Sequence, residues 1–131
     1  MSDRRIADLV ADLQLKANQF LQLANAQLAP STVAVTVTWR SGPEQAVAKA
    51  HGLSNASPGE SPHNCTMADG TPAARAFDWG VFNPDGSYVT DGNDPRYQEC
   101  GFIIKGLGLS WGGDWAHPDY DHAELVDWRD A

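Results

Sequence analysis

The residues best suited to chemistry in this sequence are histidines that stand near carboxylates. The chain has four histidines, which are His51, His63, His117 and His122. His63 is followed, after a loop, by Asp78, and Asp119 precedes His122 by three residues. A catalytic zinc ion takes three protein ligands, often histidine and carboxylate, and keeps one position open. His63, Asp78 and His122 would form such a set and leave Asp119 as a general base, although the spacing matches no helix-borne zinc motif.

The two remaining histidines have simpler interpretations. His51 precedes Gly52 at a predicted helix end, where a histidine interacts favourably with the helix dipole. His117 shares the loop of Asp119, so substrate contact and plain solvent exposure are both open for it. The glycines near residue 110 do not follow a strand as a phosphate-binding loop would, and nucleotide binding has no support.

A long N-terminal helix is the first element that must support these residues. Apolar residues recur at steps of three and four between residues 6 and 28, which predicts an amphipathic helix over about residues 3–29. Ser2 or Asp3 would cap this helix, and Pro30 would stop it. Its polar face carries Gln and Asn, whereas membrane-surface helices use Lys and Arg, so we expect it to pack on the domain.

The rest of the chain alternates between strand and helix signals. Period-two alternation predicts strands at residues 33–39, 74–82 and 122–128. Helix start and stop residues predict shorter helices at residues 43–52 and 94–105, the second closed by Gly106. Residues 55–71 are rich in Ser, Pro, Gly and Asn and are expected to form a loop. These signals predict an α+β fold in which helices flank a small antiparallel sheet.

Composition and net charge exclude some classes of partner for this domain. The chain has 131 residues and a net charge of −8, which suits one domain over residues 1–131 with a catalytic core at about 33–128. A pI near 4.7 argues against nucleic acid as a partner, because phosphate binding needs clustered Lys and Arg. No apolar run is long enough to span a membrane, and acidic residues interrupt the stretch where a signal peptide would have its apolar core. We expect a monomer.

The two cysteines leave two possibilities open. Cys65 and Cys100 are too few for a disulfide framework and lack the spacing of a redox or zinc-finger motif. They could pair with each other, or they could be the free thiols usual inside cells.

Five short segments, taken in order, resemble one family of enzymes. They are WRS at residues 39–41, SPH at 61–63, AFD at 76–78, WGGDW at 111–115 and DYDH at 119–122. This combination resembles the zinc peptidases that include D-alanyl-D-alanine carboxypeptidases and phage L-alanyl-D-glutamate endolysins, and is most similar to the second group. The stretch between His63 and Asp78 is longer than is usual in the family, a difference that a loop absorbs at small entropic cost.

The resemblance implies roles for particular residues. His63, Asp78 and His122 would hold one zinc ion per chain, Asp119 would be the catalytic base, and Arg40 would steady the substrate or the developing oxyanion. Substrate contacts are implied for residues in or beside the same segments, which are Ser61, Gln45, Trp115 and His117. Asp121 is a rival for the base, but as the immediate neighbour of His122 it should face the other side of a strand. Glu124 should share the face of His122, as a support for the ligand or as a surface carboxylate.

The resemblance also implies a function. We expect a zinc-dependent endopeptidase that cleaves the L-Ala–D-Glu bond in the stem peptide of bacterial peptidoglycan, from a phage or prophage. In the absence of a signal peptide, it would accumulate in the host cytoplasm and reach the wall through a holin. The alternatives are a D-alanyl-D-alanine carboxypeptidase of the same fold and a wall-binding module that has lost catalysis.

Overall fold

A computed structural model describes residues 3–54 and 56–129 of the chain. Four antiparallel strands form one sheet in the order β1-β2-β4-β3, and the described residues also form three α-helices, of which α1 and α3 contact the sheet. The strands are β1 (Thr32–Val37), β2 (Ala76–Phe82), β3 (Ser110–Trp111) and β4 (His122–Glu124). The helices are α1 (Ala11–Leu28), α2 (Gly42–Ala50) and α3 (Pro95–Gly106). The α+β fold predicted from the sequence is confirmed.

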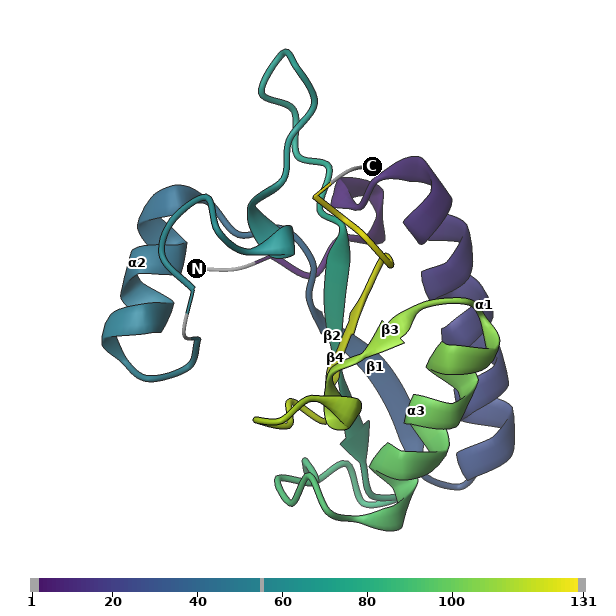
Figure 1. Ribbon diagram of the computed structural model, residues 1–131. Coiled ribbons are helices and arrows are strands. Elements are labelled where there is room, and N and C mark those ends of the chain that lie inside the picture. The colour runs from purple at the N-terminus through teal and green to yellow at the C-terminus, as the bar shows by residue number, and fades with distance from the viewer. Residues whose placement is uncertain (1–2, 55, 130–131) are drawn as a thin grey trace.

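The hydrophobic core lies between one face of the sheet and the two helices α1 and α3 (Figure 1). Because side chains alternate along a strand, Phe77, Trp79 and Val81 of β2 all point to this face, and all three are fully buried. The ring of Phe20 on α1 packs against Phe77 and Trp79 at centroid distances of 5.7 and 5.1 Å. The opposite face of β2 is therefore left for residues that do not serve the core.

Helix α1 begins later than its apolar pattern predicts. A 3-10 turn (Ile6–Asp8) comes first, and the extended residues Leu9 and Val10 then pair with Ala74. The Val10 N–H donates to the Ala74 carbonyl at 2.9 Å, so backbone pairing overrides the helical pattern. Ser2, one of the two predicted caps, lies outside the described residues. Asp3, the other, accepts hydrogen bonds from Thr38 and Arg5 instead, whereas the end of the helix before Pro30 is as predicted.

Helix α2 stands apart from α1 and α3, on the other side of the molecule (Figure 1). A capping box fixes its start, since Ser41 Oγ accepts from the Glu44 N–H at 3.2 Å and Glu44 Oε1 accepts from the Ser41 N–H at 3.0 Å. The helix stops at Ala50, two residues before its predicted end, and His51 follows as its C-cap residue. The loop that follows contains one 3-10 turn (Pro62–Asn64) and then a protruding hairpin near residues 65–73 (Figure 1).

The C-terminal part of the sheet differs from the prediction. Strand β4 ends at Glu124 and does not reach Trp128, because a turn with Asp127 at φ 55° takes the chain away from the sheet. Arg75 holds this turn, since its Nη1 donates to the Trp128 carbonyl at 2.6 Å. Strand β3 was missed in the glycine- and tryptophan-rich segment because two residues are too few to show alternation.

Both cysteines are free thiols. Cys65 is half-buried and Cys100 is buried. Burial raises the pKa of Cys100 to about 12, so this thiol stays protonated and unreactive at neutral pH. Among the described residues, no helix is both long and apolar enough to cross a membrane.

Candidate active site

The pairing of β2 with β4 sets two of the predicted metal ligands opposite each other. Asp78 and His122 are direct partners in this antiparallel pair, and both lie on the face that points away from the core. His63 reaches the same point from the 3-10 turn Pro62–Asn64. Ser61 begins this turn, and its Oγ accepts a hydrogen bond from the His63 N–H at 3.2 Å. The ligands predicted from distant parts of the sequence are thus brought together.

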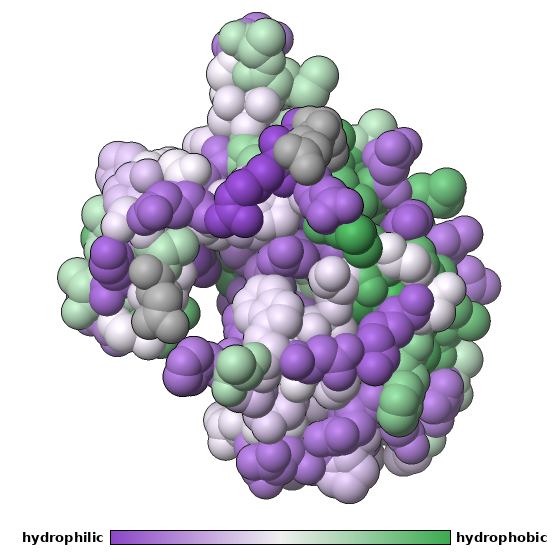
Figure 2. Space-filling model, in the orientation of Figure 1, coloured by the Kyte–Doolittle hydropathy of each residue, from purple (hydrophilic) through white to green (hydrophobic). Residues whose placement is uncertain are grey.

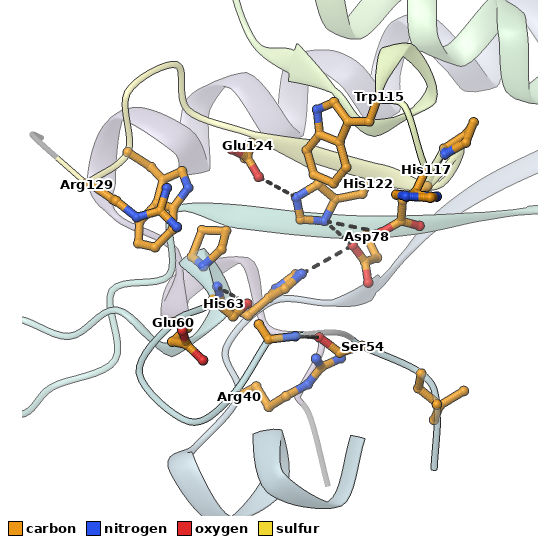
Figure 3. Close-up of a pocket in the computed structure, with 18 of the residues that line it drawn as sticks. Arg40, Ser54, Glu60, His63, Asp78, Trp115, His117, His122, Glu124 and Arg129 are labelled. Atoms are coloured by element: carbon orange, nitrogen blue, oxygen red, sulfur yellow. Dashed lines mark hydrogen bonds and ion pairs between the residues drawn. The ribbon is translucent and has the colours of Figure 1, made fainter. Parts of the chain in front are cut away.

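The three side chains converge on one point (Figure 3). Asp78 Oδ1 lies 3.2 Å from His63 Nε2 and 2.9 Å from His122 Nδ1. One ligand atom from each of the three residues lies within 4.8 Å of the others. Ligand atoms at about 2.0–2.2 Å from a tetrahedral zinc ion stand about 3.4 Å apart, close to these separations. The geometry fits a metal ion with three protein ligands and an open position.

The second nitrogen of each histidine has a partner that fixes the ring. His63 Nδ1 lies 2.8 Å from the Thr38 carbonyl, which can only accept, so Nδ1 donates to it and the ring directs Nε2 towards Asp78. His122 Nε2 lies 2.8 Å from Glu124 Oε1, and donation to this carboxylate directs Nδ1 towards Asp78. Metal-binding histidines commonly have such partners, so the surroundings of the three ligands also fit a metal site.

Burial, neighbouring charges and hydrogen bonds determine the charges of His122 and Asp78 when no metal ion is bound. Burial disfavours a charge on His122, but hydrogen bonds to Asp78 and Glu124 outweigh it and raise the pKa of His122 to about 10. Burial also favours a neutral Asp78, yet the charge of His63 and hydrogen bonds from both histidines bring the pKa of Asp78 well below its usual range. The site therefore holds a proton between its ligands where a metal ion would compete for the same lone pairs.

Asp119 lies beside the three ligands but outside their set. Its Oδ2 is 4.0 Å from His122 Nδ1, and half of its side chain is exposed. The backbone of Asp119 packs on Gly112, where a Cβ atom would come within 2.3 Å of the Asp119 carbonyl oxygen. The Asp119 N–H also donates to the Gly112 carbonyl at 2.9 Å. Only a glycine permits this approach, so the WGGDW segment supports Asp119 through its backbone.

Asp121, the rival for the base, faces away from the ligands. It lines a smaller neighbouring cavity and is absent from the described lining of the cleft that holds His63, Asp78 and His122. Burial, a hydrogen bond with Asp119 and the charge of Asp78 raise the pKa of Asp121 to about 8. Asp121 therefore carries its own proton at neutral pH and is badly placed to accept another.

The ligands lie in the wall of an open cleft of about 700 Å³. Figure 2 shows the molecule hollowed between the lobe that carries α2 and the main body. Trp115 stands over His122, with ring centroids 5.1 Å apart, and Arg40 lies on the opposite side of the ligands (Figure 3). Ser61 and His117 also line the cleft, as does Glu124. The sequence predicts that five residues contact the substrate, which are Arg40, Ser61, Gln45, Trp115 and His117. All of them except Gln45 line the cleft.

Gln45 is the exception, and its expected role needs correction. Its side chain is fully buried and does not line the cleft. Gln45 Oε1 accepts a hydrogen bond from Arg40 Nη1 at 3.1 Å, while its Nε2 donates to Ser54 Oγ at 2.9 Å and to the Ala56 carbonyl at 2.8 Å. Gln45 therefore holds Arg40 and the cleft wall in place and cannot touch a substrate itself.

A profile of the peptidase family described as D-alanyl-D-alanine carboxypeptidase matches residues 54–125, which is more than half of the chain and contains all three candidate ligands and Asp119. The chain belongs to this family of zinc peptidases. The structure of the Serratia marcescens L-Ala D-Glu endopeptidase ChiX has the same fold, with a TM-score of 0.61 and 18% sequence identity. That match covers 99% of this chain and 91% of the other. No curated protein matches the sequence.

Arg129 is a residue of the peptidase's cleft that the sequence analysis missed. The described residues lining the cleft include two permanent cations, Arg40 and Arg129. The Arg129 guanidinium stacks on Trp128 at 4.4 Å, and Arg75 fixes the backbone of Trp128. No motif or spacing marks Arg129, because it reaches the cleft only through the turn after β4.

Proposed function

We propose that this peptidase hydrolyses the L-Ala–D-Glu bond of peptidoglycan stem peptides in a zinc-dependent reaction. The observation that carries the proposal is the convergence of His63, Asp78 and His122 in the wall of an open cleft, with the Asp119 carboxylate beside them. Membership of the carboxypeptidase family and a fold shared with an L-Ala D-Glu endopeptidase support the substrate class.

His63, Asp78 and His122 would hold one zinc ion. When bound, zinc supplies a Lewis acid and lowers the pKa of water towards neutrality. Asp119, which lies next to the ligands and is partly exposed, receives a proton from the attacking water and delivers it to the leaving amine. Glu124 and the Thr38 carbonyl keep the two histidine rings in the orientation that the ligands need.

Arg40 would act on the substrate from the other side of the ligands. It is 8% exposed, and Gln45 orients its guanidinium. A cation held in this way stabilises negative charge that develops on a carbonyl oxygen, or it binds a substrate carboxylate through two hydrogen bonds. Trp115, His117 and Ser61 form the surrounding walls, over which an extended peptide would lie.

The second candidate is a D-alanyl-D-alanine carboxypeptidase. A carboxypeptidase must hold the terminal carboxylate of its substrate, and Arg129 adds a cation to the cleft for that purpose. The alternative of a wall-binding module without catalysis is disfavoured, because the Asp119 carboxylate lies beside the ligands and pure binding needs no base. A phage origin and entry through a holin stay predictions.

Digestion of purified peptidoglycan by the zinc-loaded protein, with mass spectrometry of the fragments, tests the proposal. We expect an L-Ala carboxyl on the sugar side and a new D-Glu amino terminus on the other fragment. Release of single D-alanine from otherwise intact stems would assign the carboxypeptidase instead. Binding to sacculi with no new fragment would assign a wall-binding module. Asp119→Asn with its full zinc content serves as the matched inactive control.

A further inference from the structure

A second, smaller cavity adjoins the cleft at Asp119. It has a volume of about 260 Å³, and Pro118 and Asp119 line both spaces. The chain contains three tyrosines, and all three line this cavity together with Thr90, Gly92 and Asp121. The function proposed above uses none of these tyrosines.

The tyrosine rings are held in place by packing. Tyr97 is almost fully buried, and its hydroxyl donates to the Val89 carbonyl at 2.8 Å and accepts from the Val81 N–H at 3.2 Å. Tyr120 packs closely against Gly92, where a Cβ atom would come within 2.5 Å of its ring.

Tyr88 provides the accessible aromatic surface of this cavity. Its ring lies 5.3 Å from that of Phe82 and sits over Gly80, yet the residue remains 47% exposed. The cavity thus combines fixed aromatic walls with the polar side chains of Thr90 and Asp121.

We propose that this cavity, which we call the tyrosine pocket, binds the muramyl sugar that carries the stem peptide. This inference rests on the function proposed above. A pyranose ring has apolar C–H faces and polar edges, and a tyrosine offers an apolar face with a polar tip. Small-ligand sites typically combine aromatic walls with a few convergent polar groups in this way. A pocket of about 260 Å³ is of the size of one sugar ring.

The position of the tyrosine pocket relates it to one particular bond. In peptidoglycan the L-Ala nitrogen is attached to the lactyl group of the sugar, so the L-Ala–D-Glu bond lies one residue from that group. The D-Ala–D-Ala bond lies four residues away, or about 14 Å along an extended chain. Because Asp119 lines both the cleft and the tyrosine pocket, a sugar in the pocket would bring the nearer bond to the ligands.

A comparison of two substrates tests the tyrosine pocket. One is a disaccharide-bearing muropeptide, and the other is the same stem peptide with an N-acetyl group in place of the sugar. We expect the wild type to cleave the muropeptide with a kcat/KM about tenfold higher, as loss of one aromatic contact commonly costs that much. Tyr88→Ala should lower this ratio towards one, while Tyr88→Phe should retain it.

Phe102→Ala is the matched control, since Phe102 is 66% exposed and lines neither cavity. This variant should keep the wild-type ratio. If the wild type cleaves both substrates equally and Tyr88→Ala changes them alike, the tyrosine pocket is not a sugar site, although the proposed function stands.

Binding of the peptide-free disaccharide separates the two hypotheses. We expect N-acetylglucosaminyl-N-acetylmuramic acid to shift the amide NMR signal of Gly92 in the zinc-loaded wild type, and to leave it unmoved in folded Tyr88→Ala. Such binding without cleavage of either substrate would retain the tyrosine pocket and overturn the proposed function. Absence of binding to the wild type would overturn the sugar site.

Discussion

The two faces of the β2–β4 pair carry out different tasks with residues that alternate along the same strands. On one face, Phe77, Trp79 and Ala123 are fully buried against the helices. On the other, Asp78 and His122 face each other at 2.9 Å. Asp78 is thus flanked by two core residues, Phe77 and Trp79, and His122 is followed by a third, Ala123. This arrangement separates the forces that fold the domain from the groups that perform its chemistry, and substitutions on the two faces should have different consequences.

The largest effect is expected from Asp78→Asn on the cleft face. A neutral amide is a poor replacement for a carboxylate ligand, so the variant should lose its stoichiometric zinc. Turnover of muropeptide should fall about a thousandfold or more, because a catalytic metal supplies several kcal/mol of transition-state stabilisation. Zinc is measured by elemental analysis, with the exposed Asp12→Asn as the control. A full zinc equivalent in Asp78→Asn would show that the ligand set is wrong.

Phe77→Ala makes the reciprocal change on the core face. Removal of a fully buried phenylalanine should lower the free energy of unfolding by about 3–5 kcal/mol. Chemical denaturation of the metal-free protein measures this change, while the folded fraction should still bind one zinc ion. The exposed Phe102→Ala should stay within about 0.5 kcal/mol of the wild type. Loss of zinc from folded Phe77→Ala would break the proposed separation of the two faces.

Asp119→Asn should keep both the fold and the zinc ion while it loses turnover. General acid–base catalysis is worth about 10²–10⁴-fold, so kcat should fall by that amount. Asp121→Asn, which changes a carboxyl in the tyrosine pocket, should cost less than the Asp119 substitution. A larger loss of kcat in Asp121→Asn would transfer the role of the base to Asp121.

The smallest effect is expected from Glu124→Gln. The amide oxygen still accepts from His122 Nε2, but the charge that orients and polarises the ring is gone. Zinc affinity, measured by competition with a chromophoric chelator, should weaken about tenfold. Glu99→Gln on α3 changes the same charge outside both cavities and should leave the affinity unchanged. Equal zinc affinities for the wild type and Glu124→Gln would show that the Glu124 charge does not support the metal site.

The sequence contains most of the information on the fold, because periodicity reports which face of an element is buried. It predicts α2 and α3 well, since capping residues such as Ser41 and Asp94 mark their starts. It fails at residues 3–10 and after Glu124, where backbone pairing with Ala74 and a turn held by Arg75 decide the conformation. Neither contact leaves a local pattern in the sequence.

The candidate site, too, can be predicted from the sequence only in part. His63, Asp78 and His122 are found from motifs that resemble a family, and the structure brings these three residues together. Arg129 and the tyrosine pocket are invisible in the sequence, because their residues come from segments that meet only in the folded chain. Gln45 is misjudged for the opposite reason, since its place close to the WRS segment suggests substrate contact but does not reveal that its side chain is buried and bonded to Arg40.

The register of β2 against β4 also decides whether a chain can bind the metal ion. A slip of one residue would turn Asp78 into the hydrophobic layer and bring Phe77 out to water, so folding errors and site errors would occur together. An ion that requires all three side chains would bind only correctly paired chains and would draw the population towards them. Metal supplied during refolding would thus report, and favour, the correct alignment of two strands whose facing residues, Asp78 and His122, are 44 residues apart in the sequence.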